Sequence, residues 1–382
     1  MRIVVAPDKF KGSLTASEAA RIIGAALRAC APEATIVEHP VADGGEGTVD
    51  LAVRSGFAPI VRQVPGPLGT PVSATYALRQ REAVIEMASA AGLALLPDGP
   101  DDHTAARAST HGVGVLVVDA LDRGADRIVL GVGGSASTDG GAGLLVALGA
   151  RVLDAEGRPV APGGAALVMG ARLDVSGLDS RLRGTDLVMA CDVDNPLVGP
   201  RGAARVFSPQ KGASAATVGR LEEALMHWSA LVAAETGADL ASAPSAGAAG
   251  GTAYAALALL GARLKPGVDL LLELSGFARV VAGADLVVVG EGSLDAQTLG
   301  GKGPAGVAAA ARESGASVVA VVGRTTLTRA QSACMGLDRV YAMTDVEPRT
   351  DVSMREAERV LWSTAQRVAN ECLQRPSNGV RR

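Results

Sequence analysis

The sequence predicts an α/β protein in which a doubly wound parallel sheet is interrupted by an inserted second α/β domain. Five short apolar runs, dominated by Val and Ile without polar alternation, are typical of strands buried on both faces. Helical patterns separate these runs in a β-α-β-α-β series, which favours a parallel sheet with helices on both faces. The long gap between residues 41 and 284 predicts the insertion.

The outer domain is expected to be discontinuous and to comprise residues 1–57 and 281–382. Its strands are predicted at Arg2–Ala6, Thr35–Val41, Ala284–Gly290, Ser317–Gly323 and Arg339–Met343. Its helices are predicted at Thr15–Arg28, Lys302–Ser314 and Ser353–Leu373. The first helix has apolar residues at helical spacing, and Thr15 with Glu18 forms a capping box that begins it.

The inserted domain is expected to span residues 58–280 and to have a sheet of its own. Its strands are predicted at Pro59–Val64, Val72–Leu78, Ala83–Glu86, Arg127–Gly131 and Asp186–Cys191. Its helices are predicted at Ala105–Arg123, Gly141–Ala150 and Thr217–Glu235. The uneven spacing of these strands indicates a second α/β domain rather than a repeat of the first.

The composition narrows the class of protein. The 382 residues are 48% hydrophobic, and the net charge of −4 argues against nucleic-acid binding. The start of the chain shows no charged-then-apolar leader, and the apolar run Thr252–Ala262 is too short to span a bilayer. The four cysteines form no C-x-x-C pair, which favours a cytoplasmic protein with free thiols.

Lysine is rare in this chain, and its positions are informative. Only five of the 36 basic residues are lysines, and all five lie beside glycine, proline or a loop. A lysine ammonium is a compact point charge that suits phosphate oxygens. The opening loop carries two of them, Lys9 and Lys11, with Asp8 and Ser13, between a strand end and a helix start. Both positions attract anionic ligands.

Two glycine-rich loops follow strand ends. The first, ADGGEGT, places Asp43 and Glu46 around Gly44 and Gly45. The second, GVGGSASTDGGAG at Gly131–Gly143, can form an anion-binding nest of backbone N–H groups and adds hydroxyls and an acid. The same segment also fits a dinucleotide fingerprint, with Gly131, Gly133 and Ala136 followed by Asp154.

Acidic residues follow two further strands. Asp192 and Asp194 in CDVDNPL are candidates for a general base or for magnesium ligands, although Asn-Pro is also an ordinary turn starter. GEGSLDAQTLGGKGP at Gly290–Pro304 combines acids, hydroxyls, glycines and Lys302 at a helix start. It is not a Walker A loop. Together the loops suit phosphoryl transfer, which depends mostly on positioning and charge stabilisation.

Six of these segments, in this order and spacing, resemble the bacterial type 1 glycerate kinases. They are APDKFKGSLTASEAA, ADGGEGT, IEMASAAGL, GGSASTDGGAG, CDVDNPLVGPRGAARVFSPQKGA and GEGSLDAQTLGGKGPAGVA, and the resemblance runs from Met1 to about residue 370. It implies a flavodoxin-like domain carrying an inserted domain similar to restriction endonucleases. It also implies an ATP- and Mg²⁺-dependent kinase that phosphorylates D-glycerate, most often at the 2-hydroxyl.

The resemblance implies roles that we treat as hypotheses. Asp192 is assigned as the base, with Lys9 and Lys11 as catalytic lysines, and Asp194, Glu291 and Asp295 as Mg²⁺ ligands. The residues assigned to substrate or phosphate are Asp8, Ser13, Asp43, Gly44, Gly45, Glu46, Gly133, Gly134, Ser135, Ser137, Asp139, Gly292, Ser293, Gln297, Thr298 and Lys302. Which loop holds ATP and which holds glycerate is left open.

Several alternatives remain at this point. Phosphorylation of the 3-hydroxyl is one, and a nicotinamide-dependent oxidoreductase, based on the dinucleotide fingerprint, is another. A flavodoxin-like electron carrier is less favoured, because flavin sites use aromatic side chains and only 2% of the residues are aromatic. A two-domain solute-binding protein is also conceivable. The expected partners are glycerate and a nucleotide, and neither nucleic acid nor a membrane is expected. The number of subunits is left open, and a homodimer is one possibility.

Overall fold

The computed structural model describes residues 1–41, 47–295, 298 and 303–373. The chain forms two compact units, residues 1–43 with 268–382, and residues 44–267. The sequence predicts the divisions at 57/58 and 280/281. The first difference has a physical reason, since α2 (Thr48–Arg54) packs against strands of the second unit. No helix within the described ranges is both long enough and apolar enough to cross a membrane.

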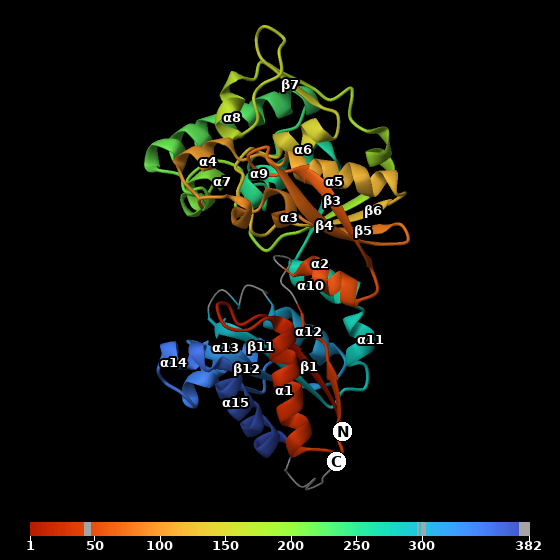
Figure 1. The fold of residues 1–382 in the computed structure, drawn as a ribbon, viewed down its shortest axis with the longest axis vertical. Helices are drawn as coiled ribbons and strands as arrows, with labels where there is room; N and C mark the ends of the chain where they lie inside the picture. Colours follow the sequence, from red (N-terminus) through yellow and green to blue (C-terminus); the bar gives the residue numbers. More distant parts are fainter. Residues whose placement is uncertain (42–46, 296–297, 299–302, 374–382) are drawn as a thin grey trace. The chain divides into compact units, whose positions relative to one another are not determined.

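The first unit contains a five-stranded sheet in which every pair of neighbours is parallel. Its order is β13-β12-β11-β1-β2, which, renumbered within the unit, is the 2-1-3-4-5 order of a doubly wound sheet. The strands are β1 (Arg2–Pro7), β2 (Thr35–Glu38), β11 (Leu286–Leu294), β12 (Ser317–Thr325) and β13 (Arg339–Ala342). The predicted parallel sheet is confirmed (Figure 1).

Helices cover both faces of this sheet. Ile3 and Val5 pack on one side with α1 (Ala16–Cys30) and α15 (Ala357–Cys372). Val4 and Ala6 point to the other side. That side is covered by α10 (Gly267–Ser275), α11 (Phe277–Val281) and α12 (Pro304–Glu313). The remaining helices are α13 (Arg329–Cys334) and α14 (Thr350–Arg355).

Two local predictions for the first unit have different outcomes. The capping box is confirmed, because Thr15 Oγ1 accepts from the N–H of Glu18 and the Glu18 carboxylate accepts from the N–H of Thr15. The single helix predicted at Ser353–Leu373 is wrong. The chain breaks at Glu356, whose φ of −107° and ψ of 31° separate α14 from α15.

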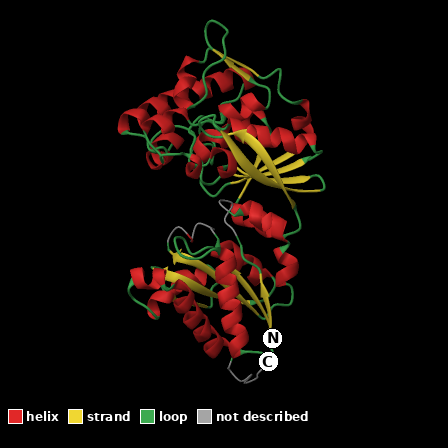
Figure 2. Cartoon of the chain, in the orientation of Figure 1, coloured by secondary structure: helices red, strands yellow, loops and turns green. Residues whose placement is uncertain are grey.

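The second unit is built on a mixed six-stranded sheet of order β10-β9-β6-β5-β4-β3. Figure 2 shows the strands of the chain in yellow. The strands β5, β6, β9 and β10 run parallel, while β3 and β4 are antiparallel additions at one edge. Their bounds are β3 (Ala58–Pro65), β4 (Pro71–Arg79), β5 (Glu82–Glu86), β6 (Arg127–Gly131), β9 (Asp186–Ala190) and β10 (Arg263–Lys265). A separate hairpin pairs β7 (Arg151–Leu153) with β8 (Arg172–Asp174).

The helices of the second unit enclose a core that includes the buried Trp228. They are α2, α3 (Ala88–Ala91), α4 (Asp102–Arg107), α5 (His111–Asp122), α6 (Ala142–Ala147), α7 (Ala203–Phe207), α8 (Ala215–Thr236) and α9 (Ala248–Leu259). The single helix predicted at Ala105–Arg123 is therefore wrong. It divides into α4 and α5 because Thr110, between them, turns its backbone N–H and its hydroxyl to the buried Asp139.

Candidate functional site

A pocket of about 560 Å³ lies at the carboxyl ends of β1, β11, β12 and β13 in the first unit. Ligands of open parallel sheets bind at this edge. The pocket brings together nine of the residues predicted from the sequence, namely Asp8, Lys9, Lys11, Ser13, Glu291, Gly292, Ser293, Asp295 and Thr298. Gly303, Arg324, Thr344, Thr350 and Ser353 also line it, together with apolar side chains that include Met343 and Met354.

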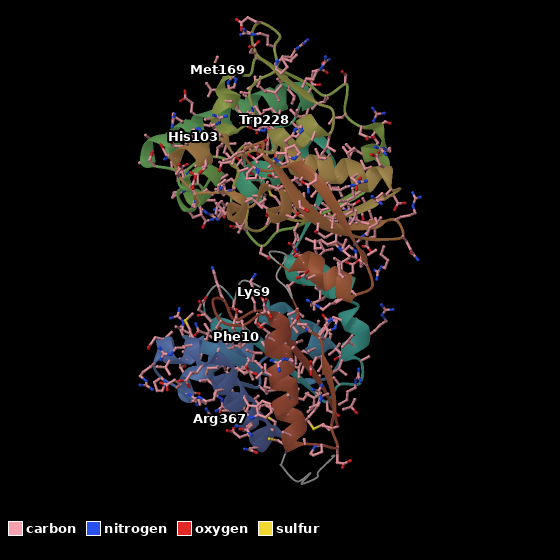
Figure 3. The ribbon with its side chains drawn as sticks, viewed as in Figure 1. Lys9, Phe10, His103, Met169, Trp228 and Arg367 are labelled. Carbon is pink, nitrogen blue, oxygen red and sulfur yellow. The ribbon has the colours of Figure 1, made fainter. Side chains whose placement is uncertain are left out.

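The lysine loop is held in place by the side chain between its two lysines. Phe10 is only 2% exposed, and its backbone pairs with Leu14 through hydrogen bonds of 2.8 and 3.0 Å. Figure 3 shows Lys9 and Phe10 in the loop that follows β1. The backbone N–H of Lys9 also donates to Asp8 Oδ1 at 2.6 Å. Anchoring Phe10 in the core keeps the flanking lysines at the pocket wall.

The helix start that meets the pocket is not the one expected next to this loop. At α1, the Glu18 carboxylate accepts from the N–H of the N-cap residue Thr15, and hydrogen bonds with Thr15 lower the pKa of Glu18. Thr15 is not among the lining residues, whereas Gly303, which precedes α12, is. The N-terminus of a helix favours anions, and α12 offers that edge to the pocket.

Acids and hydroxyls form a connected group on the β11 side of the pocket. Thr298 Oγ1 donates to Glu291 Oε1 at 2.8 Å, and Ser293 Oγ donates to Asp295 Oδ2 at 3.3 Å. Arg324 Nε donates to Ser293 Oγ at 3.2 Å. Among the described residues, no group of three or more His, Cys, Asp or Glu could hold a metal ion. Mg²⁺ often binds through one or two carboxylates completed by substrate phosphates, and Glu291 with Asp295 fits that arrangement.

The glycine-rich loop of the second unit follows β6 and has an exposed and a buried part. Gly133 and Gly134 are accessible, and the φ of +70° at Gly134 is one that glycine adopts without strain. Ser135 is 7% exposed, whereas Ser137 and Asp139 are buried. Gly131 lies opposite Ala190 in the sheet, so this loop and the segment that carries Asp192 leave the same edge.

Asp139 organises the buried part of this loop. Its carboxylate accepts from the N–H and the hydroxyl of Thr110, both at 2.8 Å, and from the N–H groups of Gly141 and Gly143, both at 3.2 Å. Burial raises the pKa of Asp139, and these hydrogen bonds oppose that change. Trp228 Nε1 donates to Gly140 O at 3.0 Å and holds the loop from α8.

Lys211 is a further candidate, which the residues predicted from the sequence do not include. It ends a 3₁₀ turn at Pro209–Lys211, and only 2% of it is exposed. Its Nζ donates to Ser135 Oγ at 2.8 Å and to Ser137 O at 2.5 Å. Burial lowers the pKa of Lys211 to about 7, against the opposing effect of the Asp139 charge. Two features of the sequence could have pointed to Lys211: lysine is rare in this chain, and Gly212 follows it directly.

Asp192 and Asp194, although close in sequence, have different surroundings. Asp192 is partly buried at the end of β9, where Oδ1 accepts from the N–H of Gly267 at 2.8 Å. Asp194 has a 77% exposed side chain and forms an ion pair with Arg201 at 2.9 Å. Neither residue lines the pocket of the first unit. Six assigned residues, Asp43, Gly44, Gly45, Glu46, Gln297 and Lys302, lie outside the described residues.

The dinucleotide fingerprint is not supported by the fold. In that fingerprint the glycines open a helix directly, but here α6 begins only at Ala142, well after Ala136. Asp154 lies in a turn where its carboxylate accepts from the N–H groups of Glu156 and Arg158. It therefore does not end a second parallel strand. The oxidoreductase alternative is rejected on this ground.

Comparisons with known proteins agree on one family. The model of the glycerate kinase family matches residues 3–373 of the chain. Glycerate kinase of Halalkalibacterium halodurans is 44% identical over 96% of this chain and 97% of that protein. Glycerate 2-kinase of Escherichia coli is 41% identical over 90% of each chain.

A solved structure shares the fold as well as the sequence. It is that of a putative glycerate kinase 2 from Salmonella typhimurium LT2, which is 40% identical to this chain. The TM-score is 0.82, and the match covers 97% of this chain and 98% of the other.

Proposed function

The chain belongs to the glycerate kinase family, and we propose that it transfers the γ-phosphoryl group of ATP to the 2-hydroxyl of D-glycerate. The products are 2-phospho-D-glycerate and ADP. The observation that carries this proposal is the pocket of the first unit, where Lys9 and Lys11 share one cavity with Glu291 and Asp295. Cations beside carboxylates suit a polyphosphate and its metal ion.

We assign this pocket to the phosphates of ATP. The ammonium groups of Lys9 and Lys11 balance phosphate charge, and the positive end of the α12 dipole lies next to Gly303 at the pocket. Glu291 and Asp295 are the residues that would hold Mg²⁺, with Thr298 and Ser293 fixing their carboxylates. Bound Mg²⁺ would neutralise charge on the phosphate oxygens. Asp194 is kept out of this set, because its exposed carboxylate is paired with Arg201.

We assign glycerate to the second unit. The N–H groups of Gly133, Gly134 and Ser135 receive its carboxylate, as an anion nest does. Asp192 accepts the proton of the attacking hydroxyl. The hydroxyl oxygen forms a bond to the γ-phosphorus as the bond from that phosphorus to the β,γ-bridging oxygen breaks, and ADP leaves with that oxygen.

The experiment is an incubation of the full chain with D-glycerate, ATP and MgCl₂. ADP release that depends on all three is the expected result, and ³¹P and ¹H NMR of the product should place the phosphate on carbon 2. The relative from Escherichia coli is named a glycerate 2-kinase, which supports this position. Phosphate on carbon 3 would show that the protein is a glycerate kinase that phosphorylates the 3-hydroxyl instead of the 2-hydroxyl. Absence of ADP release with active protein would overturn the proposal.

We also propose a cytoplasmic location. The four cysteines are all free, and reducing compartments keep thiols in this state. Light scattering on the purified protein distinguishes a monomer from a homodimer.

A further inference from the structure

Lys211 places its amino group beneath the accessible part of the glycine-rich loop. Lysine is almost never fully buried unless its charge is compensated. Both hydrogen-bond acceptors of its Nζ among the described residues, Ser135 Oγ and Ser137 O, belong to this loop. The lysine therefore supports the segment that we assign to the glycerate carboxylate.

The contact with Ser135 sets the direction of the hydroxyl hydrogen. When Lys211 is protonated, its ammonium group only donates hydrogen bonds, so Ser135 Oγ then accepts from Lys211. The hydroxyl hydrogen of Ser135 is then left to point elsewhere, and within the described residues this hydroxyl donates no hydrogen bond. A hydroxyl that accepts from a cation is a stronger donor, because hydrogen bonds in a chain polarise one another.

The backbone beside this hydroxyl is also ready to donate. Within the described residues, the N–H groups of Gly133, Gly134 and Ser135 have no hydrogen-bond acceptor. Gly133 and Gly134 are accessible to solvent, and Ser135 lies directly behind them. Three consecutive N–H groups and one hydroxyl are thus available to bind a small anionic group.

A purely structural role for Lys211 is the competing explanation, since a buried cation offsets the charge of the buried Asp139. The contacts argue against this as the whole role. Asp139 already accepts four hydrogen bonds from Thr110, Gly141 and Gly143, and Lys211 forms no ion pair with it in the described part of the chain. The ammonium points instead to Ser135 and Ser137, next to the accessible Gly133 and Gly134.

We infer that Lys211 is a positioning residue for the carboxylate of glycerate, acting through Ser135. Its ammonium fixes the Ser135 hydroxyl as a donor and adds positive charge behind the N–H groups of residues 133–135. This inference rests on the proposed function, because it takes glycerate as the ligand of the loop.

The test is a double-mutant cycle on D-glycerate affinity, measured by calorimetry on the full chain. Ser135→Ala should weaken binding about three- to tenfold, and Lys211→Met about tenfold or more. Because Lys211 acts through Ser135, Ser135→Ala should cause little further loss in the Lys211→Met background. Ser135→Thr keeps the hydroxyl and should restore most of the affinity. KM for ATP should stay near its wild-type value in every variant.

The outcomes separate this inference from the function on which it rests. If the wild-type protein neither binds nor phosphorylates D-glycerate, both the proposed function and the role of Lys211 are overturned. If wild type turns over D-glycerate, two results would overturn the role of Lys211 and leave the proposed function standing. One is additive effects in the cycle, and the other is unchanged affinity in Ser135→Ala. If Lys211→Met fails to fold, the comparison of Ser135→Ala with Ser135→Thr decides, and equal affinities in that pair would overturn the inference.

Discussion

Thr298 Oγ1 donates a hydrogen bond of 2.8 Å to Glu291 Oε1 inside the pocket of the first unit. Both residues line this pocket, and Thr298 is itself only 3% exposed. A hydroxyl in this place fixes the rotamer of the carboxylate. Partners of this kind orient the groups that bind metals.

Thr298→Val is the matching test, because valine has the same shape and lacks the hydroxyl. With Glu291 less well oriented, half-saturation by Mg²⁺ should shift upward about tenfold or more, with a parallel rise in KM for ATP. Thr298→Ser serves as the control and should stay near wild type. Mg²⁺ titrations that coincide for Thr298→Val and wild type would remove Glu291 from the metal site.

Asp192→Asn tests the proposed base. In the wild type, the N–H of Gly267 donates to Asp192 Oδ1 at 2.8 Å. Asparagine keeps an acceptor oxygen for this N–H, so the local backbone conformation should be unchanged. Loss of proton acceptance should lower kcat about 10²- to 10⁴-fold and leave the affinity for glycerate within a few-fold. Steady-state kinetics with calorimetry measures both. Normal turnover would dismiss Asp192 as the base.

Lys9→Met and Lys11→Met test the phosphate assignment. Each removes one charge from the pocket wall and should raise KM for ATP about tenfold, because charge-assisted hydrogen bonds to phosphate contribute most of that binding. Arg21→Met makes the same charge change at an exposed position on α1 and should have no effect on KM. An unaffected Lys9→Met/Lys11→Met double variant would reduce this loop to a solvated turn.

Residues at strand ends could be predicted from the sequence, and residues that depend on tertiary contacts could not. Lys9, Lys11 and Glu291 follow apolar runs directly, so the doubly wound sheet brings them to one edge. Asp139 looked like an accessible acid, yet its neighbours Thr110, Gly141 and Gly143 bury it. The same contact breaks the helix predicted at Ala105–Arg123. Lys211 lies far from Ser135 in the sequence, and no local sequence pattern predicts the contact between them.

Two glycines of the loop make a matched pair for stability. Gly134 (φ +70°) and Gly140 (φ +60°) both have left-handed backbones. A Cβ on Gly134 would meet Ala88 Cβ at 3.3 Å, whereas one on Gly140 would lie 2.4 Å from Trp228 Cδ1. Gly134→Ala should therefore cost about 1 kcal/mol of unfolding free energy and Gly140→Ala about 3 kcal/mol. Urea unfolding in a Trp362→Phe background, followed by the fluorescence of Trp228, measures both, and equal losses would contradict the clamping of this loop by α8.

The buried ammonium of Lys211 should make the stability of the second unit depend on pH. Burial lowers its pKa to about 7 in the folded protein, while an unfolded chain binds this proton up to a pKa near 10.5. Asp139 is the titratable group whose charge acts on Lys211, and the nearby Asp101 carboxylate is held by the N–H of Thr104.

Between pH 7 and 10 the unfolded state therefore holds more protons than the folded state, so this group makes unfolding free energy rise with pH. The slope from one such group is at most about 1.4 kcal/mol per pH unit. Lys211→Met should lose this rise, and other titrations cancel in the comparison with wild type. Urea unfolding at pH 7, 8 and 9, followed by Trp228 fluorescence in the Trp362→Phe background, gives the two slopes. Parallel slopes would mean that Lys211 keeps its proton throughout this range, and the ammonium would then be fully charged beneath Ser135 at every pH at which the enzyme is assayed.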